Sequence, residues 1–509
     1  MKLTRASGIL LHPTSLPGPG GIGSLGVEAR AFVDFLVETG QSVWQILPLG
    51  PTGYGDSPYS AFSAFAGNPL LVSLSQLATW GDLRTGDLPD ESGRDPRRVD
   101  FGRVHGEKEH LLQRAAQNFQ RHASAERRQA FDDFCALQGY WLHDYVLFRA
   151  LRERYRHRPW NLWPADLRHR DPQALTQAAE ELAAELHWRK YTEFVFFTQW
   201  FALKDYANAR GVQILGDIPI FVSFDSVDVW ANQPLFHLDE EGDPLIVAGV
   251  PPDYFSATGQ RWGNPLYRWE RMAEQDYSWW MARFRWNLAQ TDAVRIDHFR
   301  GFEGYWAIPA EEETAVKGEW RPGPGASFFQ AVRRTLGEVA IVAEDLGVIT
   351  PEVEALRDGF GFPGMKILQF AFDGGPSNPY LPHNIRPNGL VYTGTHDNDT
   401  TLGWWHHLDK KHKDQVRAYL GHGLRDMPWD LMRAALASVA DWCVLPLQDI
   451  LGLGSEARMN RPGLGTGNWD WRFTSEQLTT DIGQRLAELT RLYGRRPAPA
   501  EGQNRQGNA

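Results

Sequence analysis

Cysteine is scarce in this chain, and long apolar runs are missing. Only two cysteines, Cys135 and Cys443, occur among 509 residues, so we expect no framework of disulfide bonds and a reducing, cytoplasmic location. No apolar run approaches the roughly 18 residues that a membrane span needs. The apolar run near the start, Gly8 to Leu11, stops at His12 and Pro13, and we therefore predict no signal peptide.

An excess of positive charge is also missing. The 63 acidic side chains outnumber the 52 lysines and arginines, which gives a net charge of −11. Because nucleic acids and anionic membranes bind basic surfaces, this balance argues against both as partners. The composition is otherwise that of a globular protein, with 42% hydrophobic residues available for a large core.

Aromatic residues, in contrast, are abundant, with 21 Trp, 15 Tyr and 27 Phe. Many of them stand beside glycine, asparagine, aspartate or proline, as in TGYGDSPYSAFSAFAGNPL and QRWGNPLY. Rings in polar loops suit flat ligands that have apolar faces and hydroxyl rims, which is a description of sugars. The alternative is that these rings only anchor the loops.

Short apolar runs alternate with helix-like segments, a pattern that predicts parallel βα units. The runs lie at residues 42–50, 212–222, 291–299, 338–347, 365–373 and 389–399. After the run at 338–347, a helix is expected to begin beyond Thr350 and to end near Gly359. Glu344 and Asp345 therefore follow a strand directly, at the edge of the sheet where barrel active sites are built.

Two parts of the chain depart from this alternation. Residues from about 82 to 190 contain little glycine and much Arg, Glu, Gln, Ala and Leu, which predicts inserted amphipathic helices. Residues from about 223 to 290 are rich in loops and predict a lid. We expect the barrel to occupy residues 1–495 around these insertions, and the polar tail 496–509 to be disordered.

One motif is rejected. GPGGIG at residues 18–23 matches the dinucleotide-binding pattern, but the segment before it carries two prolines and the strand–turn–helix context is absent. Walker A, H-E-x-x-H and G-x-S-x-G motifs do not occur. We therefore expect neither a nucleotide cofactor nor a catalytic metal.

Three strand ends carry candidate catalytic acids. In AVRIDHF, Arg295 and Asp297 are two residues apart and face the same way, so the guanidinium would keep the carboxylate ionised as a nucleophile. The alternative is a purely structural ion pair. Glu344, beside apolar residues, would have a raised pKa, as a general acid requires, although one acid of this pair could instead cap the next helix.

The third strand end is THDNDT, which contains His396 and Asp397. These residue types are also good metal ligands, but no H-x-H motif or Cys/His cluster accompanies them. Together the three segments place Asp, Glu and Asp at the ends of three strands of one sheet. Paired carboxylates on either side of a sugar C1 are the groups that cleave glycosidic bonds.

The segments GDIPIFV, VRIDHFRG, AEDLG and THDNDT resemble the four ordered strand motifs of the α-amylase clan. Five further segments make the chain similar to the amylomaltase family of 4-alpha-glucanotransferases: HPTSLPGPGGIGSLG, SPYSAFSAFAGNPLL, DVWANQPLF, SATGQRWGNPLY and PLQDILGLGSEARMNRPG. The resemblance runs from about residue 8 to residue 473. It implies the α/β class, a (β/α)8 TIM barrel with inserted subdomains and no C-terminal β-sandwich.

The resemblance also implies an activity. A retaining enzyme of this family would transfer α-1,4-glucan segments between maltooligosaccharides, with glucose as one acceptor and without a cofactor. By motif match, Asp297 would be the nucleophile, Glu344 the acid/base and Asp397 the third carboxylate that stabilises the transition state. The implied sugar-binding residues are Tyr59, Asp217, Tyr254, Phe255, Gln260, Trp262, Arg295, Asp345, Asp373, His396 and Asn468.

Two other functions compete with glucan transfer. An α-glucan hydrolase of the same clan would carry the same three acids. A non-catalytic glucan-binding protein would not need all three, and all three are present.

Overall fold

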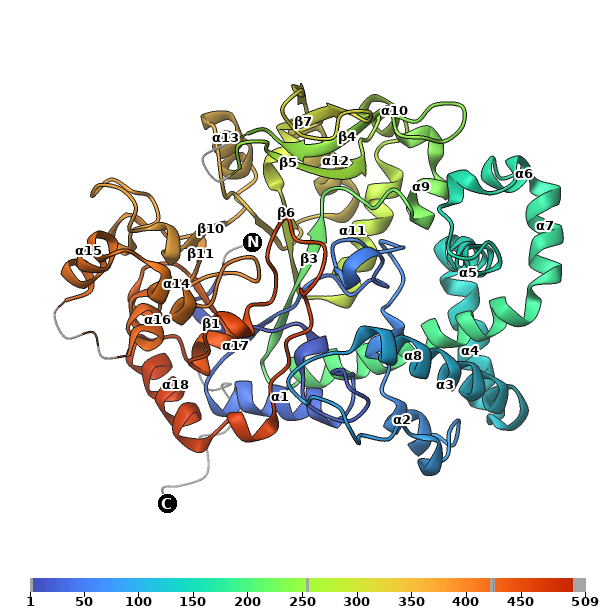
Figure 1. The fold of residues 1–509 in the computed structure, drawn as a ribbon, viewed down its shortest axis with the longest axis horizontal. Helices are drawn as coiled ribbons and strands as arrows, with labels where there is room; N and C mark the ends of the chain where they lie inside the picture. Colours follow the sequence, from blue (N-terminus) through green and yellow to red (C-terminus); the bar gives the residue numbers. More distant parts are fainter. Residues whose placement is uncertain (1–2, 253–255, 422–423, 425, 498–509) are drawn as a thin grey trace, which may run out of the picture.

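Eight parallel strands form a nearly closed barrel in the computed structural model, which describes residues 3–252, 256–421, 424 and 426–497 (Figure 1). Their order around the sheet is β10-β11-β12-β1-β2-β3-β6-β9. The strands are β1 (Ala6–Leu10), β2 (Val43–Gln45), β3 (Gln213–Pro219), β6 (Ala293–Asp297), β9 (Ile341–Ala343), β10 (Gly364–Ile367), β11 (Gly389–Tyr392) and β12 (Trp442–Pro446). Between β9 and β10, the Ala343 N–H donates to the Pro363 carbonyl at 2.8 Å. The predicted TIM-barrel fold is confirmed.

The barrel strands are buried because their small and branched apolar side chains pack on both faces of the sheet. β1, β2, β9 and β12 are buried at every residue. In β6 only the last residue, Asp297, is partly exposed, since it reaches the rim of the barrel. The register pairs Arg295 of β6 with Asp217 of β3, which places a charged pair inside the upper barrel.

Helices cover the outside of the barrel, as a βα alternation requires. They are α1 (Val27–Glu38), α8 (Ala183–Asn208), α11 (Ser278–Gln290), α12 (Gly325–Leu336), α13 (Pro351–Gly359), α16 (Met427–Ala437) and α18 (Thr480–Leu492). Helix α13 has Thr350 as its N-cap and ends at Gly359, as predicted. Between β10 and β11 the chain, described throughout, makes only 3-10 turns and no α-helix.

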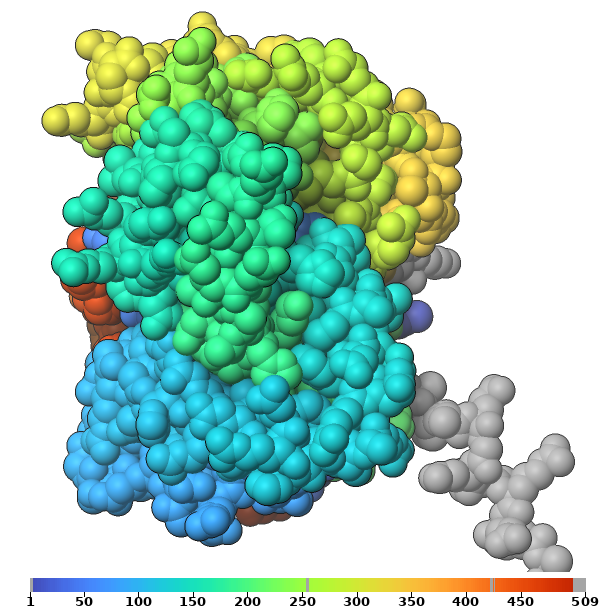
Figure 2. Space-filling model, turned by 90° about the vertical axis from the view of Figure 1, so that its right-hand side faces the viewer, coloured from blue at the N-terminus to red at the C-terminus, as the bar shows by residue number. Residues whose placement is uncertain are grey.

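A helical subdomain lies between β2 and α8. It contains α3 (Phe101–His122), α4 (Ala125–Leu137), α5 (Gly139–Arg154), α6 (Ala165–Arg168) and α7 (Pro172–Glu181). Figure 2 shows the residues of this subdomain, light blue through cyan to green, on one face of the molecule. Helix α8 packs against α3 and α5 and also against β3, so the predicted end of the insertion near residue 190 falls inside a helix shared with the barrel.

A second, four-stranded antiparallel sheet lies beside the carboxyl ends of the barrel strands (Figure 1). Its order is β5-β4-β7-β8, with β4 (Ile246–Val250), β5 (Gln260–Pro265), β7 (Gly304–Pro309) and β8 (Glu319–Pro322). Two of these strands come from the range 223–290, which also supplies α9 (Val227–Ala231), α10 (Trp269–Glu274) and α11. Helix α11 packs against β3 and β6 and so covers the barrel.

The remaining helices are short connections: α2 (Leu74–Thr79), α14 (Thr401–His407), α15 (Lys410–Leu420) and α17 (Leu447–Ile450). The described residues beyond β12, 447–497, contain helices and turns but no β-strand. Most of the tail predicted to be disordered lies outside the described residues. None of the described helices combines the length and apolarity needed to cross a membrane.

Candidate active site

A cleft of about 1530 Å³ opens at the carboxyl ends of the barrel strands. Asp297 is the last residue of β6, Glu344 comes directly after β9, and Asp397 follows β11. All three side chains line this cleft. The structure thus brings together the three acids that the sequence places at separate strand ends.

Arg295 links two of the barrel carboxylates. Its guanidinium lies 2.8 Å from Asp297 Oδ1 and 2.7 Å from Asp217 Oδ2. Burial lowers the pKa of Arg295, but the two carboxylates raise it well above its usual value. The guanidinium therefore stays charged and bridges the two carboxylates.

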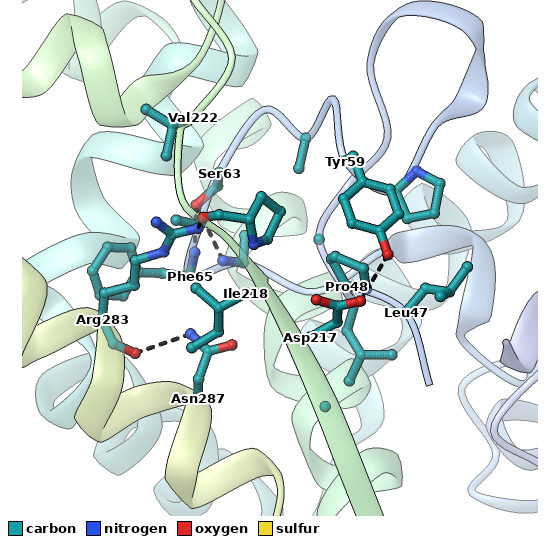
Figure 3. Close-up of a pocket in the computed structure, with 18 of the residues that line it drawn as sticks. Leu47, Pro48, Tyr59, Ser63, Phe65, Asp217, Ile218, Val222, Arg283 and Asn287 are labelled. Atoms are coloured by element: carbon teal, nitrogen blue, oxygen red, sulfur yellow. Dashed lines mark hydrogen bonds between the residues drawn. The ribbon is translucent and has the colours of Figure 1, made fainter. Parts of the chain in front are cut away.

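Asp217 lies behind the cleft wall and not on its surface. Its side chain is fully buried, and its Oδ2 accepts a 2.7 Å hydrogen bond from the Tyr59 hydroxyl (Figure 3). Burial raises the pKa of Asp217 to about 6, against the opposing effect of Arg295. That Asp217 binds substrate stays a prediction; in this structure the residue contacts Tyr59 and Arg295, which line the cleft.

Tyr59 belongs to an aromatic wall of the cleft. Its ring stacks on His396 with the centroids 5.2 Å apart, and Trp469 lies 6.0 Å from Tyr59 and 5.9 Å from His396. Trp469 also lines the cleft, although the sequence analysis did not select it. The aromatic residues in the segment NWDW were the signal that could have identified it.

Glu344 is held by two backbone N–H groups. His298 donates to Oε2 at 2.7 Å and Leu346 donates to Oε1 at 3.0 Å. His298 adopts the left-handed conformation, with φ 53°, and this uncommon backbone geometry lies directly beside Asp297. Burial raises the pKa of Glu344 to about 8, and the charge of Asp297 adds to this effect while Arg295 opposes it. The raised pKa predicted for a general acid is confirmed.

Asp397 is fixed by three neighbours. Its Oδ1 accepts from the Asn460 amide at 2.6 Å, its Oδ2 lies 3.3 Å from His396 Nε2, and its carbonyl accepts from Arg458 at 2.6 Å. Burial raises the pKa of Asp397, but His396, the Asn460 amide and Arg295 together lower it well below its usual value. The carboxylate is therefore ionised at neutral pH.

Asn460 also holds the backbone of the loop that carries His396 and Asp397, because the Asn460 N–H donates to the His396 carbonyl at 3.0 Å. The sequence analysis quoted the segment SEARMNRPG but assigned Asn460 and Arg458 no role. A polar cluster that follows a strand was the available signal.

The other predicted residues divide into two groups. Gln260, Trp262, Asp373 and Asn468 line the cleft. The Asn468 side chain, however, accepts from Arg461 N at 2.9 Å and donates to Leu464 O at 2.8 Å. It therefore shapes the loop at 461–468 by these bonds. Tyr254 and Phe255 lie outside the described residues.

Asp345 does not reach the cleft. Its carboxylate accepts from the Met365 N–H at 2.6 Å, contacts Arg357 and lies 3.5 Å from Lys366. Only 1% of the side chain is exposed. The sugar contact stays a prediction; in this structure Asp345 joins the end of β9 to β10 and α13.

The described part of the chain contains no group of three or more His, Cys, Asp or Glu side chains placed to hold a metal ion. His396 faces the Asp397 carboxylate and the Tyr59 ring instead. Asp297, Glu344 and Asp397 line one cleft, and this arrangement supports the chemistry of a carboxylate nucleophile, a protonated acid and an ionised third carboxylate.

Comparison with known proteins agrees with this geometry. The sequence profile described as 4-alpha-glucanotransferase matches residues 11–479. A 4-alpha-glucanotransferase of Thermus thermophilus is 53% identical over 497 residues, which cover 96% of this chain and 99% of that protein. One from Synechocystis sp. is 51% identical, covering 97% and 98%. The structure of amylomaltase from Streptococcus agalactiae in complex with acarbose superimposes with a TM-score of 0.94 at 40% identity, covering 97% of this chain and all of that one.

Proposed function

The chain belongs to the 4-alpha-glucanotransferase family, and from this premise we propose which of its residues carry out the transfer. The protein transfers α-1,4-glucan segments from a donor maltooligosaccharide to an acceptor glucan. The observation that carries the proposal is the convergence of Asp297, Glu344 and Asp397 on one cleft. Free glucose is proposed as an additional acceptor, and the two free cysteines favour a cytoplasmic location.

In the first half of the reaction, Asp297 attacks C1 of a bound glucose unit. Arg295, 2.8 Å away, holds the carboxylate in position. Glu344, protonated at neutral pH because its pKa is raised to about 8, gives its proton to the departing oxygen. The segment beyond the cleaved bond leaves, and the donor sugar becomes covalently linked to Asp297.

In the second half, Glu344 acts as the base. Formation of the ester removes the negative charge of Asp297, which is one of the causes that raise the Glu344 pKa. The two N–H donors, His298 and Leu346, then favour the carboxylate form. Glu344 takes the proton from the 4-hydroxyl of the acceptor, and that oxygen attacks C1 to form a new α-1,4 bond. The ester bond between C1 and Asp297 breaks in the same step, and Asp297 leaves as a carboxylate.

Asp397 stabilises the positive charge that develops on the sugar ring in both steps. It stays ionised because His396 and Asn460 hold it, and a fixed negative charge in a cleft is effective without reorganisation. Each of the two displacements inverts the configuration at C1. Together they restore the α configuration, which is the retaining outcome.

Transfer prevails over hydrolysis only where the acceptor is held and water is kept away. An oriented acceptor can have an effective concentration on the order of 10⁵ M, far above that of water. Aromatic side chains in the cleft, among them Trp262 and Trp469, provide surfaces for such an acceptor.

Incubation with maltotriose tests this function. We expect a ladder of longer and shorter maltooligosaccharides together with glucose, seen by chromatography, and an unchanged ladder after treatment with EDTA. Conversion to glucose and maltose alone would indicate a hydrolase, and no conversion would indicate a binding protein. Loss of activity with EDTA that a divalent ion restores would contradict the metal-free mechanism.

A further inference from the structure

Trp320 lines the cleft from β8, an edge strand of the antiparallel sheet, and 43% of its surface is exposed. An indole ring is a large apolar surface whose exposure to water is unfavourable. Trp320 shares the cleft with Trp262, which is 39% exposed, and with Val348, which is 69% exposed. Trp320, Trp262 and Val348 therefore give their part of the cleft an apolar lining.

The Trp320 ring is held in place from two directions. The Arg300 guanidinium lies 3.9 Å above the ring centroid, and Trp306 on the paired strand β7 packs edge-on with its centroid 5.3 Å away. Arg300 also donates a hydrogen bond to the Val348 carbonyl. Because one face of the indole is covered by Arg300, a ligand in the cleft can stack only on what remains exposed.

This region adjoins the leaving-group side of the reaction centre. Arg300 lies three residues after Asp297, and Val348 lies four residues after Glu344, the residue that protonates the leaving oxygen. Arg300 joins the two segments in space, because its guanidinium lies over the Trp320 ring and donates to the Val348 carbonyl. Tyr59, His396 and Trp469 form a separate ring cluster beside Asp397. Trp320 therefore lies beside the segment that follows Glu344.

We propose that Trp320 is a stacking platform on the acceptor side of the cleft, for glucose units beyond the one that reacts. The ligand class is an α-1,4-linked glucan, whose sugar rings present apolar C–H faces to an aromatic ring. This inference rests on the proposed function. It makes Trp320 a determinant of acceptor length, and the residue does not touch the reacting atoms.

The test compares short and long acceptors. With soluble starch as donor, transfer to fluorescently labelled glucose and to fluorescently labelled maltopentaose is measured for the wild type and for Trp320→Ala. We expect KM for maltopentaose to rise about tenfold, which corresponds to about 1.4 kcal/mol. KM for glucose and kcat should change by less than about twofold, since glucose occupies only the reacting position. Trp320→Phe, which keeps an aromatic face, should recover most of the loss.

Tyr140→Ala serves as the matched control, because Tyr140 is an aromatic residue on α5 that is 58% exposed and does not line the cleft. It should leave both KM values unchanged. Equal effects of Trp320→Ala on both acceptors, or no effect on either, would overturn the platform while leaving glucan transfer intact. Absence of transfer in the wild type would instead refute the proposed function. Thermal unfolding of each variant separates a local effect from loss of the fold.

Discussion

Glu344 must hold a proton in one half of the reaction and accept one in the other. Its neighbours supply both conditions, because burial and Asp297 raise its pKa to about 8 while two backbone N–H groups favour its charged form. The sequence indicated the raised pKa from the apolar strand before Glu344. It could not indicate the contacts with His298 and Leu346, which depend on how the loops after β6 and β9 turn.

The raised pKa has a consequence for stability. Between the unfolded value of about 4.3 and the folded value of about 8, the folded protein binds a proton that the unfolded chain does not. This contribution is complete below the unfolded pKa and is lost as the pH rises through the folded one. For Glu344→Gln, which does not titrate, we expect the melting temperature relative to wild type to increase by a few degrees between pH 4.5 and 8.5.

Calorimetry of both proteins across this pH range measures the difference. A difference that stays constant with pH would show that Glu344 titrates at its ordinary value. The same substitution should lower kcat by about 10²- to 10⁴-fold, since it removes the general acid.

Asn460 acts on the reaction through Asp397. Asn460→Ala removes the 2.6 Å bond to Asp397 Oδ1 but keeps the backbone bond to His396. A hydrogen bond to a charged group contributes about 1.5–3 kcal/mol, so kcat should fall about tenfold to a hundredfold while KM changes little.

Steady-state kinetics from pH 4 to 8 test this expectation. Asn161→Ala is a suitable control, since Asn161 bonds to Asp243 and does not line the cleft. A variant that raises KM alone would place Asn460 in substrate binding and not in the positioning of Asp397.

At the scale of elements, the sequence located six of the eight barrel strands but neither β1 nor β12. A proline stands at the end of each, since Pro13 follows β1 closely and Pro446 is the last residue of β12. Proline argues against a central strand, so neither run carried a clear strand signal. Their identity is decided by pairing with each other in the sheet, between residues far apart in the chain.

The antiparallel sheet was missed for a related reason. β4 pairs with β7 some sixty residues later, as in the pair Val247 and Ile308, so its strands form through distant partners. The sequence of β5, QRWGNP, has no strand-like alternation and looked like a loop. This sheet carries Gln260, Trp262 and Trp320 into the cleft.

Two of the predicted site residues, Asp217 and Asp345, also illustrate the strand geometry. Adjacent residues of an extended chain point to opposite sides, so Glu344 faces the cleft while Asp345 faces Arg357 and Lys366. Asp217 faces inward beside Arg295, but Tyr59 from another segment covers it. The sequence predicts that an acid lies at a strand end. Whether the side chain of that acid is exposed to the cleft depends on segments that are distant in the chain.

One buried acid secures the element that carries His396 and Asp397. Asp449, in α17, accepts from the hydroxyls of Thr393 and Thr401 and from the Thr401 N–H, and so joins both ends of the loop between β11 and α14. Asp449→Ala leaves these buried donors without partners, at about 1–3 kcal/mol each. We expect the free energy of unfolding to fall by about 3 kcal/mol or more and kcat to fall with it.

Urea unfolding and kinetics on the same preparation check this result. The control is Asp132→Ala, at an exposed position of α4, where a change within about 0.5 kcal/mol is expected. Unchanged stability of Asp449→Ala would mean that the loop between β11 and α14 is held by other contacts.

At the scale of the whole molecule, the barrel supplies a rigid ring of strand ends, and the inserted segments supply the walls of the cleft. The net charge of −11 and the paired carboxylates suit a neutral sugar polymer as the ligand. The sequence could predict the ring, because hydrophobic alternation and polar strand ends are local features. It could not predict the walls, which are assembled from β5, β8 and the loop at 461–468.

Trapping the covalent intermediate tests the central claim most directly. An α-glucosyl fluoride needs no proton to expel its leaving group, so Glu344→Gln should form the linkage to Asp297 and be unable to complete the transfer. Peptide mass spectrometry is expected to find glucose attached to Asp297 and to no other residue, and to find none in the double variant that also carries Asp297→Asn. Turnover without any adduct on Asp297, with release of a product of inverted configuration, would contradict the account.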